Sequence, residues 1–188
     1  GDVSFIVLMA GSGVPGDELL SEQSRMLLAA SGATAEQLAA ASARQHDLLE
    51  LFKSEKDPAT FERKLRESMQ GRMSETELNV AIAQTKGRWF RYFVEYDPAT
   101  DLRKTTVPVL ALNGSKDLQV SSTQNLPVIR KALDAAHNGD FETVELAGLN
   151  HLFQTAQSGL PVEYGTIEET IAPVAFDKIA TWLLAHTR

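Results

Sequence analysis

The stretch Val107-Pro-Val-Leu-Ala-Leu-Asn-Gly-Ser-Lys-Asp-Leu-Gln-Val120 decides the fold. Its first six residues, 107–112, form a continuous apolar run, which is typical of a strand buried on both faces of a parallel sheet. Asn113-Gly114 is expected to break this strand, because glycine lets the backbone turn or adopt a positive φ. Asp117 then follows just beyond the carboxyl end of the strand, where open α/β sheets bind their ligands. The stretch therefore predicts an acidic site residue at a strand end.

A second predicted strand, residues 141–146, runs into the loop Ala147-Gly-Leu-Asn-His151. A carboxylate at one strand end and a histidine at the next match two members of a Ser…Asp…His hydrolase triad, in that chain order. In such a triad the aspartate orients the imidazole and stabilises the imidazolium that forms. Asp117 and His151 are therefore the candidate catalytic residues. The alternative is structural: a carboxylate that caps its own turn, and a histidine that is hydrogen-bonded within a loop.

Composition limits the class of protein. The length of 188 residues suits a single domain, and the net charge is −7, from 25 acidic and 18 basic residues. This charge argues against nucleic acid or an anionic membrane as a partner. The absence of cysteine excludes disulfides, thiolate metal sites and a cysteine nucleophile. No apolar run is long enough for a transmembrane helix, so a soluble protein is expected, cytoplasmic or exported, with no bound metal.

The first predicted strand, residues 3–9, leads into a loop that contains Gly11-Ser-Gly-Val-Pro-Gly16, a formal match to the dinucleotide fingerprint G-x-G-x-x-G. Asp17 and Glu18 stand where a pyrophosphate would bind, and they would repel it. The fingerprint also requires another strand within about 30 residues, whereas an alanine-rich helical pattern follows. We therefore interpret the loop as a flexible strand-to-helix connection and predict no cofactor.

Residues 17–96 carry helical signals and no convincing strand. Thr34-x-x-Gln37 is a capping box, and Asp57-Pro58 places a capping acid before a proline at the first helical position. Four or five helices are predicted there, more than a simple crossover between strands needs. We interpret 17–96 as a helical cap or lid on a core formed by 1–16 and 97–188. An independent helical subdomain is the alternative.

Aromatic residues gather at the end of this insertion, in Arg88-Trp-Phe-Arg-Tyr-Phe-Val-Glu-Tyr-Asp-Pro98. They either pack the insertion against the sheet or form a wall of an acyl pocket. Further helices are predicted at about 124–136, after serines that can act as an N-cap, and at 173–186.

Several of these motifs together resemble the C-terminal part of bacterial α/β-hydrolases. The resemblance rests on Pro108–Val120, on Leu149-Asn-His-Leu-Phe-Gln154 and on Glu163-Tyr-Gly-Thr-Ile-Glu-Glu-Thr170, and the first strand and the aromatic segment extend it over the whole chain. It is closest to the serine hydrolases of the dienelactone hydrolase and serine aminopeptidase-like group. The resemblance implies about three parallel strands with flanking helices and a large helical cap. It also implies Asp117 as the triad acid, His151 as the triad base and a small acyl substrate.

The nucleophile motif of that family has no counterpart here. It is G-x-S-x-G, on a strand-to-helix elbow upstream of the first strand, and no serine of this chain has glycine at both positions −2 and +2. We therefore predict a truncated serine hydrolase for esters or related acyl compounds, inactive by itself because it lacks the nucleophile and the oxyanion hole. The alternative is a stand-alone assembly or binding domain in which Asp117 and His151 are vestiges.

The first strand carries a prediction about partners. It would lie inside the sheet of the complete family fold, so in this chain one of its edges is expected to be unpaired. Such an edge predicts either a homodimer formed through the first strand or association with the missing half of the hydrolase.

Overall fold

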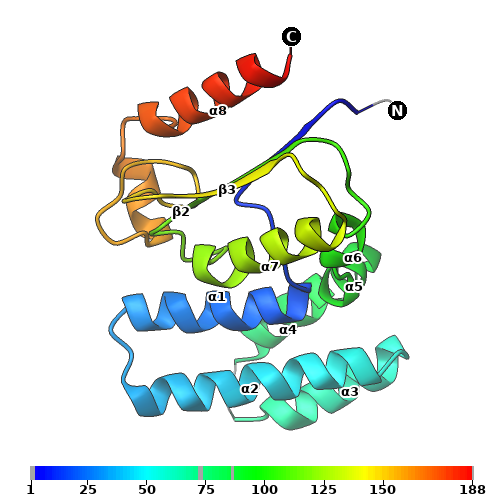
Figure 1. Cartoon of the computed structure of the whole chain (residues 1–188). Helices are drawn as coiled ribbons and strands as arrows, with labels where there is room; N and C mark the ends of the chain where they lie inside the picture. Colours follow the sequence, from blue (N-terminus) through cyan, green and yellow to red (C-terminus); the bar gives the residue numbers. More distant parts are fainter. Residues whose placement is uncertain (1–2, 72–73, 86, 188) are drawn as a thin grey trace.

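The computed structural model describes residues 3–71, 74–85 and 87–187 (Figure 1). Three parallel strands form one sheet in the order β1-β2-β3: β1 (Ile6–Met9), β2 (Val109–Gly114) and β3 (Phe141–Leu146). The prediction of an α/β fold with three parallel strands in sequential order is confirmed. Because β1 pairs only with β2 in the described part of the chain, its other edge lies at the border of the sheet.

The strand at the centre of the sheet, β2, is buried along its whole length. Alternate residues of β2 pack on opposite faces of the sheet. Leu110 and Leu112 pack under helix α8 (Pro173–His186), whose Trp182 joins the same apolar cluster. Val109 and Ala111 pack on the opposite face, under helix α7 (Ser122–Ala135). The sheet therefore lies between α8 and α7 (Figure 1).

Two strand boundaries differ from the sequence prediction. Strand β1 begins at Ile6 rather than at residue 3. Strand β2 begins at Val109, because Pro108 before it has no N–H to donate and Val109 is the first residue in register with β3. Strand β2 then continues through Asn113 and Gly114, so the expected break at these two residues is wrong.

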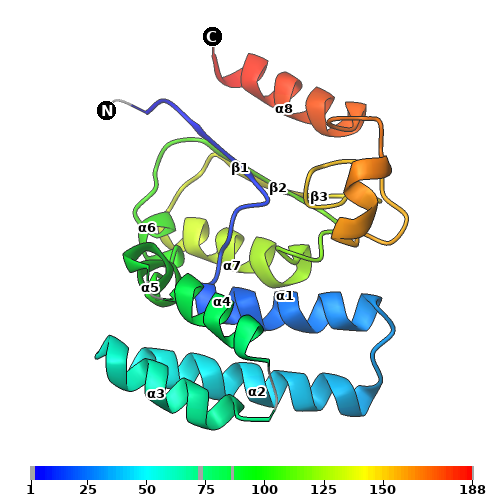
Figure 2. The same cartoon turned by 180° about the vertical axis from the view of Figure 1, so that it is seen from behind.

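The predicted helical insertion is present between β1 and β2. It consists of α1 (Gly16–Ala30), α2 (Ala35–Ser54), α3 (Pro58–Met69), α4 (Glu75–Thr85) and α5 (Arg88–Glu95). The capping box at the start of α2 is confirmed, since Thr34 Oγ1 accepts from the Gln37 N–H and Gln37 Oε1 accepts from the Thr34 N–H. The insertion has its own apolar cluster, centred on Phe52 and Leu65. Figures 1 and 2 show its helices stacked beyond α7, on the side of the sheet opposite α8.

Shorter elements complete the chain. The single-turn helix α6 (Ala99–Leu102) leads into β2, and a 3₁₀ helix, η1 (Pro161–Thr166), follows the loop that carries His151. Helix α7 begins two residues earlier than predicted, with Ser121 as its N-cap. Among the described residues, none of the helices is both long and apolar enough to span a bilayer.

Candidate active site

The predicted acid and base face each other beyond the carboxyl ends of β2 and β3. His151 Nδ1 lies 2.9 Å from Asp117 Oδ2. The Asp117 side chain is fully buried, whereas 28% of the His151 side chain is exposed. Because an ionised carboxylate only accepts hydrogen bonds, the proton in this contact belongs to Nδ1, and the Nε2 lone pair of a neutral imidazole is left for other chemistry. This is the orientation in which a triad histidine acts as a base.

The turn after β2, residues 115–121, holds the carboxylate in place; we call it the aspartate loop. Asp117 Oδ1 accepts from the backbone N–H groups of Gln119, at 2.9 Å, and Val120, at 2.8 Å. The buried Asn113 side chain closes the same turn, because its Nδ2 donates to the Val120 carbonyl at 2.9 Å. One carboxylate oxygen is thus bound to the turn, and the other is presented to the imidazole.

The turn after β3, residues 147–156, is the histidine loop, and it is organised by Asn150. Asn150 is fully buried, and its Oδ1 accepts from the N–H groups of Leu152 and Gln154 at 2.9 and 3.0 Å. Its Nδ2 donates to Gln154 Oε1 at 3.0 Å. Phe153 adopts a φ of 59°, which is uncommon for a residue other than glycine. Local hydrogen bonds therefore determine the path of the backbone that presents His151.

The two loops are also joined to each other. The Lys116 N–H donates to the Leu149 carbonyl at 2.9 Å, and the Gly148 N–H donates to Ser115 Oγ at 2.8 Å. A Cβ at Gly114 would lie 2.1 Å from the Leu149 carbonyl oxygen. Glycine is required at this position because the histidine loop approaches the backbone closely, and not because β2 has to turn there.

The glycine-rich loop after β1 is the predicted connection from strand to helix, but it is packed rather than flexible. The Gly13 N–H donates to the side chain of Asn125 on α7 at 2.8 Å. A Cβ at Gly16 would lie 2.2 Å from the Phe93 carbonyl oxygen, so α5 approaches the loop directly. Asp17, in the first turn of α1, pairs with Lys53 at 2.9 Å. Packing against neighbouring helices therefore accounts for the glycines at positions 13 and 16.

The aromatic segment of α5 divides between core and surface. Phe90 and Phe93 pack against the apolar cluster of the insertion, whereas Trp89 and Tyr92 are 70% and 63% exposed. Figures 1 and 2 place α5 towards the amino end of β2, away from the aspartate loop and the histidine loop. The arrangement favours the packing interpretation over the wall of an acyl pocket.

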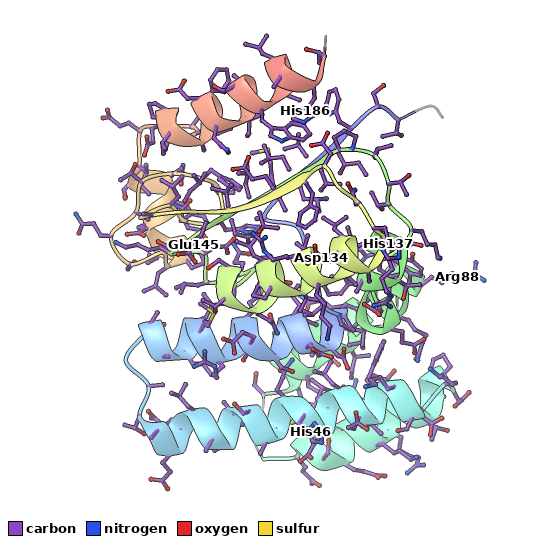
Figure 3. All side chains as sticks on the ribbon, in the orientation of Figure 1. His46, Arg88, Asp134, His137, Glu145 and His186 are labelled. Atoms are coloured by element: carbon purple, nitrogen blue, oxygen red, sulfur yellow. The ribbon has the colours of Figure 1, made fainter. Side chains whose placement is uncertain are left out.

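The other three histidines lie on separate elements and far from one another (Figure 3). His46 is on α2, His137 lies beyond the end of α7, and His186 is the last residue of α8. Among the residues that the structure describes, no three His, Asp or Glu side chains are grouped as metal ligands would be. His151 is thus the histidine of this chain that lies opposite a buried carboxylate.

Comparisons with known proteins give little beyond this geometry. No protein-family model matches the sequence. No curated protein matches it either. Among solved structures, MenH from S. aureus aligns with 99% of this chain and 60% of its own, at 13% identity and a TM-score of 0.35. The chain thus spans about three-fifths of the length of that protein.

Sequence reasoning did not identify two residues beside the pair. Gln119 Nε2 donates to Tyr164 Oη at 3.1 Å, across 45 positions of sequence. Burial raises the pKa of the Tyr164 phenol above its ordinary value, and the nearby charge of Asp117 raises it further. Neither residue belongs to a periodic pattern or to a nucleophile, base or metal motif. Gln119 lies in the aspartate loop itself, and only the return of η1 to that loop brings Tyr164 to the site.

Proposed function

We propose that this chain supplies the acid and base of a Ser-His-Asp hydrolase for carboxylic esters or related acyl compounds. The observation that supports this function is the 2.9 Å contact between His151 Nδ1 and Asp117 Oδ2, with Oδ1 already bound by two backbone N–H groups. Asp117 would hold the ring with its proton on Nδ1 and stabilise the imidazolium. His151 Nε2 would take the proton of an attacking hydroxyl and later give it to the leaving group.

The attacking hydroxyl would come from outside these 188 residues. In the described part of the chain no hydroxyl forms a hydrogen bond with His151 Nε2, and the sequence contains no G-x-S-x-G. A serine presented at the carboxyl end of the sheet, within hydrogen-bond reach of Nε2, would complete the triad. The segment that carries this serine would also supply the oxyanion hole, so the chain alone would be inactive.

The edge of β1 that is unpaired among the described residues would give this segment a place to bind. Strand β1 pairs with β2 along one edge, and its residues Ile6–Met9 contain no lysine or proline that would discourage a further strand. A strand leading to the nucleophile would pair there, and in its absence a second copy of the chain would do so. The helical insertion, residues 17–96, would act as the cap of the completed enzyme, as the family resemblance implies.

The test is to sequence the DNA upstream of the codon for residue 1 and to express the longer protein that its open reading frame encodes. We expect the frame to encode G-x-S-x-G, and we expect a serine-directed fluorophosphonate probe to label that serine. His151→Ala should greatly reduce the labelling, because the hydroxyl loses its base, whereas His46→Ala on α2 should leave it unchanged. A frame without the motif, or labelling that is indifferent to His151, would refute the proposed function.

A further inference from the structure

The segment that follows the histidine loop folds back onto the aspartate loop. Lys116 Nζ donates to the carbonyl groups of Ala156, at 2.7 Å, and Gln157, at 2.6 Å. The Glu163 carboxylate accepts from the Gly159 N–H at 2.6 Å, which ties the start of this segment to η1. These contacts hold η1 against the two loops that carry the catalytic pair.

One side chain of η1, that of Tyr164, reaches the aspartate loop beside the pair. Tyr164 Oη accepts a hydrogen bond from Gln119 Nε2 at 3.1 Å, and the N–H of the same Gln119 donates to Asp117 Oδ1 at 2.9 Å. The pKa of the Tyr164 phenol is raised first by burial and also by the charge of Asp117, while Gln119 and the backbone amide of His151 act in the opposite direction. The phenolic oxygen is therefore linked to Asp117 through the side chain and the backbone N–H of Gln119.

We propose that Tyr164 is a positioning residue for the Asp117–His151 pair. Through its hydrogen bond with Gln119 it fixes the aspartate loop, and it thereby holds Asp117 Oδ2 against His151 Nδ1. This proposal rests on the proposed function only for the catalytic role of Asp117 and His151, since the contact between the two residues is present in this chain.

A purely structural role for Tyr164 makes a different prediction. If the tyrosine only packs η1, then the ring matters and the hydroxyl does not. Tyr164→Phe keeps the ring and removes Oη, and Gln119→Leu removes the donor while its backbone N–H to Asp117 remains. Both substitutions delete the same hydrogen bond, so their effects should not add. Val162→Ala is the matched control, because Val162 lies in the same 3₁₀ helix and is 82% exposed.

The experiment measures how fast the Nδ1 proton of His151 exchanges with water, by proton NMR on the 188-residue chain. We expect Tyr164→Phe and Gln119→Leu each to accelerate this exchange by about three- to tenfold, as expected for the loss of one ordinary hydrogen bond. The double variant should exchange no faster than the faster single variant. Val162→Ala should exchange at the wild-type rate.

Three results would overturn the proposal. In the first, Tyr164→Phe folds and leaves the exchange rate unchanged. If that variant does not fold, an unchanged exchange rate in Gln119→Leu refutes the proposal instead. In the second, Val162→Ala accelerates exchange as much as Tyr164→Phe, so that any loosening of η1 suffices. In the third, the wild-type Nδ1 proton exchanges as fast as that of a free imidazole. None of these results depends on hydrolysis, so this proposal and the proposed function can fail separately.

Discussion

Replacing Asp117 by asparagine should move the imidazole proton of His151 from Nδ1 to Nε2. In the wild-type chain Asp117 Oδ1 accepts the N–H groups of Gln119 and Val120, and Oδ2 accepts from His151 Nδ1. Asparagine has a single oxygen, and this oxygen must take the place of Oδ1, because an NH₂ group there would face two donors. The NH₂ group then faces His151 and donates to Nδ1. A neutral ring that accepts at Nδ1 carries its proton on Nε2.

The size of the effect follows from the two backbone donors. The opposite orientation of the amide would leave the N–H groups of Gln119 and Val120 without an acceptor, at a cost of about 1–3 kcal/mol each. A total of at least about 2 kcal/mol restricts the opposite orientation to roughly one molecule in thirty. In a complete triad, a histidine held in the wrong tautomer lowers kcat by about 10⁴. That factor corresponds to about 5.5 kcal/mol of activation free energy.

The assay is ¹⁵N NMR of the imidazole in the labelled 188-residue chain, at a pH where the ring is neutral. A protonated and an unprotonated ring nitrogen give well-separated chemical shifts, so the spectrum identifies the tautomer directly. We expect the proton on Nδ1 in the wild-type chain and on Nε2 in Asp117→Asn, while the exposed His46 serves as an internal reference in both spectra. A proton that stays on Nδ1 in the variant, or that already resides on Nε2 in the wild-type chain, would refute the reasoning.

Three further predictions concern stability and association. Gly114→Ala should destabilise the chain by about 2 kcal/mol or more in urea unfolding, because a Cβ would lie 2.1 Å from the Leu149 carbonyl oxygen. Gly139→Ala is the control: a Cβ there has nothing within 4 Å, so the free energy of unfolding should change by less than about 0.5 kcal/mol. Equal losses of stability in the two variants would contradict the close approach of the loops. The hydrogen bond from His186 to the Trp182 carbonyl raises the pKa of His186, with a further contribution from Asp140. A raised folded-state pKa stabilises the fold below about pH 6.5, and this contribution is lost as the pH rises through the raised value. His186→Gln should therefore lower the urea midpoint more at about pH 5.5 than at about pH 8.5. A larger decrease at alkaline pH would show that the pKa of His186 is not raised by folding. Ile6→Lys places a charge beside the edge of β1 that is unpaired in the described part of the chain, on a side chain that packs against the apolar cluster under α7. It should therefore weaken self-association or drive aggregation in light scattering, whereas Val162→Lys on the exposed η1 should change neither. A wild-type chain that is a compact monomer at tens of micromolar, unaffected by either lysine, would remove the basis for pairing through β1.

The sequence was sufficient to predict the sheet and the contact between Asp117 and His151. The apolar run at 107–112 and the strand at 141–146 had to lie side by side, and parallel strands bring the residues beyond their carboxyl ends to one edge of the sheet. Asp117 and His151 meet for that reason. The helical insertion could also be predicted, because its caps, such as Thr34 with Gln37, are made by residues close together in sequence.

The features that the sequence did not reveal depend on contacts between distant residues. Gly114 resembles a turn glycine in sequence, and its requirement comes from the Leu149 carbonyl, which no local pattern indicates. The residue in the left-handed conformation after α7 is His137, with a φ of 54°, although Gly139 follows two residues later. Tyr164 reaches Gln119 only because the backbone of 156–163 is fastened to the aspartate loop. For Gly114 and Tyr164 the deciding partner is contributed by another loop.

The central claim is that Asp117 and His151 act on a serine that these 188 residues do not contain. The most direct test is the hydrolysis of p-nitrophenyl acetate by the chain alone and by the longer protein encoded by its upstream frame, each compared with its own His151→Ala variant. We predict that the chain alone hydrolyses the ester no faster than its variant, and that in the longer protein His151→Ala lowers kcat by about 10⁴ or more. Esterase activity of the chain alone that a serine-directed inhibitor abolishes, or a longer protein that keeps its kcat without His151, would contradict the account.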